Sequence, residues 1–201
     1  MQNTSTNFAG QQSGERVLYH SGQHAAALVP GTIKVLALAI IWVFLFVILS
    51  QFGFGSLGIG IVLALITLVA GIPLVRMMQQ KNTFYVTDRR VVRFEANTPF
   101  TARTRSLSWS DAVKTKTYPP NIFWKMINVG TVVIHSQSTF VQGNEPRTGE
   151  ALSNDDIDLV HTYYYEDLGN YIDKVIYLYK NNASELASLK GFVPKPRGQR
   201  D

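Results

Sequence analysis

The stretches VLALAIIWVFLFVILSQF (35–52) and LGIGIVLALITLVAGIPLV (57–75) hold no charged residue, and only four residues separate them. At a rise of about 1.5 Å per residue, runs of this length reach across a hydrocarbon core of roughly 30 Å. The sequence therefore predicts a transmembrane hairpin with helices over 33–52 and 57–76. The two flanks of such a hairpin lie on the same side of the bilayer.

Basic residues mark that side. Lys34 precedes the first predicted helix, Arg76 and Lys81 follow the second, and the turn between them holds neither Lys nor Arg. Cytoplasmic flanks of membrane helices carry an excess of Lys and Arg. We therefore expect a multi-pass protein of the cytoplasmic (inner) membrane with both termini in the cytoplasm.

One face of the second predicted helix is built from small residues. Gly60, Ala64, Thr67 and Gly71 recur at spacings of four, three and four, so they share a helical face. Small residues allow a neighbouring helix to approach closely. The partner of this candidate packing face is either the first helix or another copy of the chain.

The rest of the 201 residues divides by composition. A polar tail (1–13), expected to be disordered, and a juxtamembrane segment (14–32) precede the hairpin. A domain over 82–180 follows it, and 181–201 form a short helix or extension with a basic tail. Residues 76–125 carry ten Lys or Arg against three Asp or Glu, a net charge of +7, whereas 126–173 carry a net charge of −7. The basic block follows the membrane directly, where anionic lipids attract Lys and Arg.

After Lys81 the pattern changes to short runs of β-branched and aromatic residues divided by turn residues. About seven such runs without intervening helices predict an antiparallel barrel or sandwich. From Asp167, apolar residues follow a 3.6-residue period that includes Leu168, Ile172 and Val175, which predicts a closing amphipathic helix. The predicted class is thus an α+β membrane protein.

Short segments add a family resemblance. GERVL at 14–18 with His24, YVTDRRVV at 85–92 and VGTVVI at 129–134, together with the order of elements, resemble the bacterial pleckstrin-homology-like (PH-like) membrane proteins. The resemblance spans about 14–180. It implies a strongly bent, seven-stranded β-barrel capped at one end by the helix from about Asp167.

Several chemical motifs have a simpler explanation. GFGSLG (53–58) matches a dinucleotide-binding fingerprint, yet it lies between two membrane helices and is better explained as a flexible turn. His20 and His24 have metal-ligand spacing but lack a third ligand. Asp155, Asp156 and Asp158 lack the glycine and distal Glu of a calcium loop and are interpreted as a solvated acidic loop. The sequence predicts no metal site and no cofactor.

Enzyme chemistry is not expected either. The chain has no cysteine, which excludes thiol catalysis and disulfides, and no nucleophile–base pair or phosphate-binding loop can be assembled from it. The basic block does not indicate nucleic acid binding, because the hairpin tethers it to a membrane.

One charged constellation suits a ligand. Five arginines lie in the first predicted hairpins of the domain, and the planar fork of arginine donates two hydrogen bonds to one phosphate. By resemblance to PH domains, they are candidate contacts for an anionic lipid headgroup, or else they form ion pairs and a diffuse basic field. They are Arg89, Arg90, Arg93, Arg103 and Arg105.

Three functions follow as expectations. The first is a non-catalytic, membrane-anchored PH-like module that docks a protein partner through strand edges, the long segment 137–158 or the basic tail. The second is a sensor of anionic headgroups that uses the five arginines. The third is an accessory subunit of a membrane transport or secretion assembly that packs through the Gly60 face.

Overall fold

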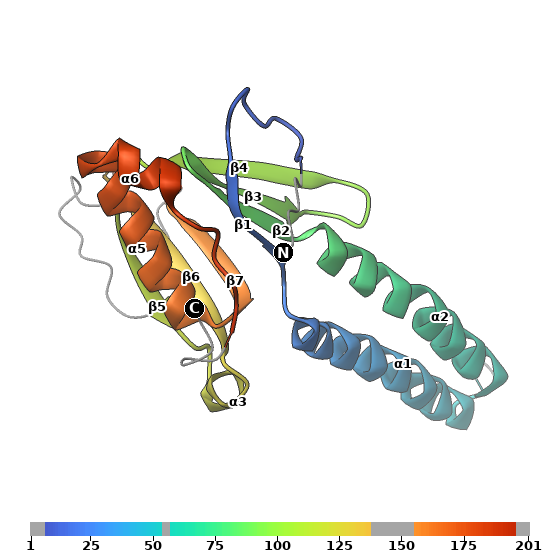
Figure 1. Cartoon of the computed structure of the whole chain (residues 1–201). Helices are drawn as coiled ribbons and strands as arrows, with labels where there is room; N and C mark the ends of the chain where they lie inside the picture. Colours follow the sequence, from blue (N-terminus) through green and yellow to red (C-terminus); the bar gives the residue numbers. More distant parts are fainter. Residues whose placement is uncertain (1–6, 54–56, 138–154, 196–201) are drawn as a thin grey trace. The chain divides into compact units, whose positions relative to one another are not determined.

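The computed structural model describes residues 7–53, 57–137 and 155–195 and shows an α+β protein with two antiparallel β-sheets and two long apolar helices (Figure 1). The chain forms two compact units. One is a helical hairpin of residues 25–81 together with the turn 96–102. The other, here called the sheet domain, comprises the residues up to His24, 82–95 and those from Arg103 onward. The hairpin is therefore inserted into the sheet domain.

The hairpin consists of α1 (Leu28–Gln51), preceded by the short 3-10 turn η1 (Ala25–Ala27), and α2 (Leu57–Lys81). Both helices are long and apolar enough to cross a membrane, and most of their side chains are exposed. A Cβ built at Gly60 would lie 2.7 Å from Phe46 Cβ, and one at Gly71 would lie 2.8 Å from Val35 Cγ1. These glycines of the small-residue face thus lie directly against α1, where only a hydrogen atom fits.

The first sheet contains four strands in the order β1 (Val17–Gly22), β2 (Thr83–Thr87), β3 (Arg90–Ala96) and β4 (Ala102–Ser108). β1 pairs antiparallel with β2 although the hairpin separates them in sequence, and Gly22 lies opposite Thr83. The juxtamembrane segment predicted at 14–32 therefore contributes a strand to the same sheet as residues of the predicted 82–180 domain.

The second sheet has the order β5 (Ala112–Tyr118), β6 (Val129–Ser136) and β7 (Ile157–Tyr163). The short helix α3 (Ile122–Met126) connects β5 to β6, so the prediction of strands without intervening helices is wrong at this connection. The long helix α5 (Tyr165–Asn181) lies against β5 and β6 (Figure 1). Asn182 ends α5, and its side chain accepts the Glu185 N–H at the start of α6 (Ala183–Ser188). The helical pattern that continues past Asn181 is therefore a second helix.

The closed barrel implied by the resemblance is not what the described strands form, because they make two separate sheets. The break lies between β4 and β5. There the Trp109 N–H donates to Arg89 O and its indole Nε1 donates to Thr87 O, so the end of β4 is tied to the β2–β3 turn, and β5 begins the second sheet. Trp109 is completely buried at this corner.

A common apolar core joins both sheets to α5. Its members come from every strand of both sheets, from the turn between β4 and β5, and from α5 and α6. They include Leu18, Val86, Val91, Trp109, Val132, Ile134, Leu159, Leu168, Ile172 and Val175. The amphipathic period of α5 matches this burial, because its apolar face is the face turned to the core.

Candidate functional site

The first two predicted arginines lie at the tight turn between β2 and β3, where the N-terminal segment contacts them. Arg90 donates from Nε to Glu15 Oε1 and from Nη2 to Glu15 Oε2, both at 3.0 Å. Arg90 Nη2 also donates to Gly10 O at 2.6 Å, and Arg89 Nη1 lies 3.4 Å from Gln12 Oε1. The charge of Arg90 is thus neutralised by a bidentate ion pair within the chain.

Glu15 is enclosed on all sides at this turn. Its side chain is 0% exposed, its Oε1 lies 2.8 Å from the hydroxyl of Thr87, and its Oε2 accepts the Gln12 N–H at 2.8 Å. Burial acts to raise the pKa of Glu15, but hydrogen bonds from Arg90, Gln12 and Thr87 and the charge of Arg90 hold it below its ordinary value. Glu15 is therefore an ionised carboxylate that links the N-terminal segment to the β2–β3 turn.

Arg93 is buried between the two sheets. Its Nη1 donates to Asp158 on β7, and its Nη2 donates to Glu95 at 3.3 Å. Only 7% of the residue is exposed. Two carboxylates thus pair with a guanidinium that solvent scarcely reaches, so Arg93 acts as a bridge between β3 and β7.

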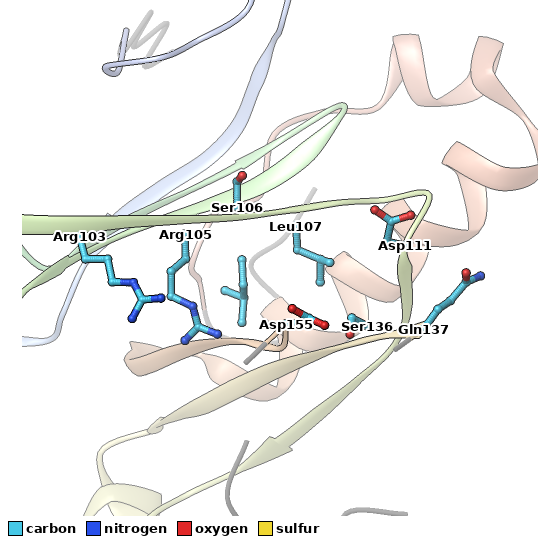
Figure 2. Close-up of a pocket in the computed structure, with 9 residues that line it drawn as sticks. Arg103, Arg105, Ser106, Leu107, Asp111, Ser136, Gln137 and Asp155 are labelled. Atoms are coloured by element: carbon cyan, nitrogen blue, oxygen red, sulfur yellow. The ribbon is translucent and has the colours of Figure 1, made fainter. Parts of the chain in front are cut away.

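The last two predicted arginines line a cavity of about 510 Å³ (Figure 2). Arg103 and Arg105 stand two residues apart on β4, so their side chains extend from the same face of the strand. Arg105 Nη2 donates to the carbonyl of Asp156, while the Arg103 side chain is exposed and forms no ion pair with the described residues. The other lining residues are Ser106, Leu107, Asp111, Ser136, Gln137, Asp155 and Ile157. The Ser106 side chain points to the opposite side of β4 from Arg103 and Arg105 (Figure 2).

The five arginines are therefore divided among three places. Arg89 and Arg90 hold the N-terminal segment, Arg93 bridges the sheets, and Arg103 and Arg105 line the cavity. Only the last two combine exposure to solvent with a shared concave surface. Binding of an anionic group remains a prediction. Of the five arginines, Arg103 and Arg105 are the two that the structure brings together in a cavity.

A buried pair of side chains, His135 and Asp156, lies beside the cavity and was not predicted from the sequence. His135 Nδ1 lies 2.9 Å from Asp156 Oδ2, and the other carboxylate oxygen accepts the Ser136 N–H at 2.9 Å. Asp156 is 1% exposed, and Asp158 pairs with Arg93. The interpretation of Asp156 and Asp158 as part of a solvated acidic loop is therefore wrong. Asp156 pairs with His135, and Asp158 pairs with Arg93, inside the domain.

The other candidate metal residues do not converge. His20 stacks on Tyr85 with ring centroids 4.4 Å apart, whereas His24 stacks on Tyr163 at 5.6 Å. Within 7–53, 57–137 and 155–195, no three His, Cys, Asp or Glu side chains gather as metal ligands do.

The outer edges of the two sheets differ in how the chain covers them. On β1, Leu18 O accepts the Phe192 N–H at 3.0 Å, and on β7, His161 O accepts the His24 N–H at 2.8 Å. On β5, the Thr115 N–H donates to Asp173 of α5 at 2.9 Å. β4 ends its sheet, and no strand from the described part of the chain is added to it. This open edge lies beside the arginine-lined cavity.

The segment 137–158, predicted as a docking element, falls largely outside the described residues, which resume at Asp155. Its two described ends, Gln137 and Asp155, both line the cavity.

The chain matches no family model, no curated protein and no solved structure. Its resemblance to the PH-like membrane proteins stays a prediction carried by the segments at 14–18, 85–92 and 129–134.

Proposed function

We propose that this protein is a non-catalytic docking module held at the cytoplasmic face of a membrane by the α1–α2 hairpin. Its PH-like sheet domain captures an extended, acidic segment of a partner protein along the outer edge of β4. The observation that carries this proposal is the combination on one strand of an outer edge, to which no strand of 7–53, 57–137 or 155–195 is added, and two cavity-lining arginines.

Membrane anchoring is supported by the surface of the hairpin. Helices α1 and α2 span 24 and 25 residues. In the most apolar 18-residue stretch of each, only 6% and 11% is buried, respectively. A core helix of a soluble protein hides its apolar side chains, whereas these expose them on nearly every side. Lys34 and Lys81 lie toward the ends that join the sheet domain, which favours a cytoplasmic location for that domain.

Capture along β4 is supported by strand chemistry. An exposed sheet edge presents unpaired N–H and C=O groups, and an extended peptide can satisfy them by adding a strand. The other three outer strands already form hydrogen bonds at their edges: β1 and β7 accept from the Phe192 and His24 N–H groups, and β5 donates to the Asp173 carboxylate. The guanidinium of Arg103 at this edge favours a partner with Asp or Glu at alternate positions.

Two alternatives use the same features differently. Arg103 and Arg105 also suit the phosphate of a lipid headgroup, which would make the domain a lipid sensor. An accessory role in a transport or secretion assembly relied on the Gly60 face, which in the structure lies against Phe46 of α1. The first alternative is separated from docking by the experiment below.

The test places a photo-crosslinking amino acid at Ser106, an exposed β4 residue, in the full-length protein in native membranes. The same amino acid at Ser184 on α6 is the control position. We expect a protein adduct at Ser106 but not at Ser184. The double variant Arg103→Glu/Arg105→Glu should abolish it. The control variant Lys174→Glu/Lys190→Glu, which changes the net charge equally at exposed positions, should retain it.

Three results count against docking. Adducts that contain only lipid support the headgroup sensor, and adducts within the chain itself show that β4 is already covered. If both charge-reversed variants lose the adduct equally, adduct formation depends on the net charge of the protein and not on Arg103 and Arg105.

A further inference from the structure

The short connection between β5 and β6 exposes large apolar side chains. Ile122 is 78% exposed, Phe123 56% and Met126 77%. All three belong to the five-residue helix α3, which lies between β5 and β6 in the chain (Figure 1). Tyr118, the last residue of β5, is 42% exposed, and Tyr163, the last residue of β7, is 39% exposed. Most apolar side chains of the sheet domain are buried in the core, so this cluster is a distinct surface, here called the α3 tip.

The α3 tip is held firmly by its own contacts. The side chain of Asn121 accepts the Trp124 N–H at 3.2 Å, and the Tyr164 N–H donates to Asn128 O at 2.8 Å. Trp124 is 6% exposed and lies 4.5 Å from the ring of His161. Because Trp124 occupies the buried side, the apolar side chains of its neighbours remain outside.

The α3 tip also lies at the end of the sheet domain where the chain leaves for the hairpin. His161, which contacts Trp124, accepts the His24 N–H at 2.8 Å, and His24 stacks on Tyr163. Residue 25, the first of the hairpin unit, follows His24 directly. The return connection is equally short, since Asn82 alone separates the end of α2 from β2.

We propose that the α3 tip inserts into the interfacial layer of the bilayer and contacts anionic lipid. This inference rests on the membrane anchoring in the proposed function. If α1 enters a membrane just after His24, the α3 tip adjoins the residue before that entry point, because Tyr163 of the tip stacks on His24. Its composition suits the interface: Ile122, Phe123 and Met126 reach the acyl boundary, and the tyrosines have an apolar ring with a polar end.

The charge of the α3 tip also favours contact with anionic lipid. Lys125, the one charged residue of α3, is exposed between Phe123 and Met126. A lysine extends its ammonium group toward phosphate while its methylene stem stays among apolar groups. Anionic lipids of the cytoplasmic leaflet attract such a side chain. With α1 and α2, the α3 tip would give the domain a third contact and hold it in one orientation on the membrane.

The absence of cysteine in the chain makes the test direct. Single-cysteine variants of the full-length protein are labelled with an environment-sensitive fluorophore and reconstituted at low protein density into vesicles of mixed neutral and anionic lipid. Met126→Cys reports on the α3 tip, Ile40→Cys on an exposed site of α1, and Ser184→Cys on an exposed site of α6. Quenching by a shallow lipid-bound nitroxide is compared with quenching by a water-soluble ion.

We expect the label at Met126 to be quenched by the shallow lipid nitroxide and shielded from the aqueous quencher, with the opposite result at Ser184. Adding Lys125→Gln should reduce the lipid quenching at Met126 in anionic vesicles and leave it unchanged in neutral ones. The label at Ile40 should respond to lipid nitroxide throughout.

The controls separate the possible failures. If Met126 behaves like Ser184 while Ile40 lies in lipid, the α3 tip is not inserted, although the anchor stands. If Ile40 is exposed to the aqueous quencher, the membrane anchor itself is wrong. A label at Met126 that neither quencher reaches indicates coverage by protein and also overturns lipid contact.

Discussion

Among single residues, Glu15 gives the clearest link between a buried charge and the stability of the fold. It belongs to a short segment ahead of β1, yet it joins Arg90 and Thr87 from the β2–β3 turn. An ionised carboxylate is buried at low cost only when it is paired and hydrogen-bonded, as it is here. Glu15 therefore ties the N-terminal segment to the first sheet.

We expect Glu15→Gln to lower the local free energy of unfolding of β2 and β3 by about 2 kcal/mol, because Arg90 then loses its charge partner in a largely enclosed site. Hydrogen exchange of the β2 and β3 amides in the full-length protein in nanodiscs measures this change. Glu185→Gln, the same change at an exposed carboxylate, is the control and should leave exchange unchanged.

The lowered pKa of Glu15 also predicts a pH dependence. A carboxyl group with a lowered pKa in the folded state stabilises the fold fully above its ordinary value of 4.5. This contribution is lost as the pH falls through the lowered pKa. The native protein should therefore lose β2–β3 protection in acid more steeply than Glu15→Gln does. Identical pH profiles for the two proteins would remove Glu15 from this role.

Between elements, the contact of α5 with the second sheet depends on a glycine inside the helix. A Cβ built at Gly169 would lie 2.3 Å from Thr117 Cγ2 on β5. The Thr115 hydroxyl donates to Gly169 O at 3.3 Å in the same place. The helix can thus approach β5 closely enough to cover its edge only because position 169 has no side chain.

Gly169→Ala tests this contact, because helix propensity and close packing predict changes in stability of opposite sign. Helix propensity alone predicts a gain of about 1 kcal/mol, whereas overpacking against a stiff β-branched side chain costs about 1–3 kcal/mol. We expect a net loss of protection in the amides of α5. Adding Thr117→Ser removes Cγ2 and should restore most of it. A stabilised single variant, or a double variant without recovery, would contradict close packing here.

For the whole molecule, the insertion of the hairpin between β1 and β2 is the main organising feature. Because β1 and β2 pair with Gly22 opposite Thr83, both connections to the hairpin leave from one end of the first sheet. A domain tied by two short connections stays close to whatever holds its hairpin. This arrangement suits a module that acts at a membrane surface.

The proposed topology predicts which residues are reached from each side of the membrane. Gln51, next to the turn of the hairpin, and Ser184 on α6 are both exposed. In right-side-out vesicles, an impermeant thiol reagent should label Gln51→Cys from outside and Ser184→Cys only after permeabilisation. Labelling of both positions from the same side would refute a hairpin that spans the membrane with its termini inside.

Local patterns were enough to predict the apolar hairpin, the strand-rich region and the amphipathic helix. Residues 35–52 and 57–75 are uniformly apolar, and the 3.6-residue period of Leu168, Ile172 and Val175 is read along one short stretch. Each of these features depends on neighbours only a few positions apart in the chain. The structure accordingly has two apolar helices, two antiparallel sheets and an amphipathic helix, although α1 begins at Leu28, ahead of the predicted 33, and α2 runs to Lys81, beyond the predicted 76.

The partners of the charged residues depended on the folded chain. Arg90 pairs with Glu15 across 75 positions and Arg93 with Asp158 across 65, while Arg103 lines the cavity without an ion pair to a described residue. Nothing in the local sequence separates these arginines, because the site each one occupies is set by strand register and by the turn at Trp109. Local periodicity thus specified the elements. Long-range pairing specified which charges were used inside the fold and which side chains line the cavity.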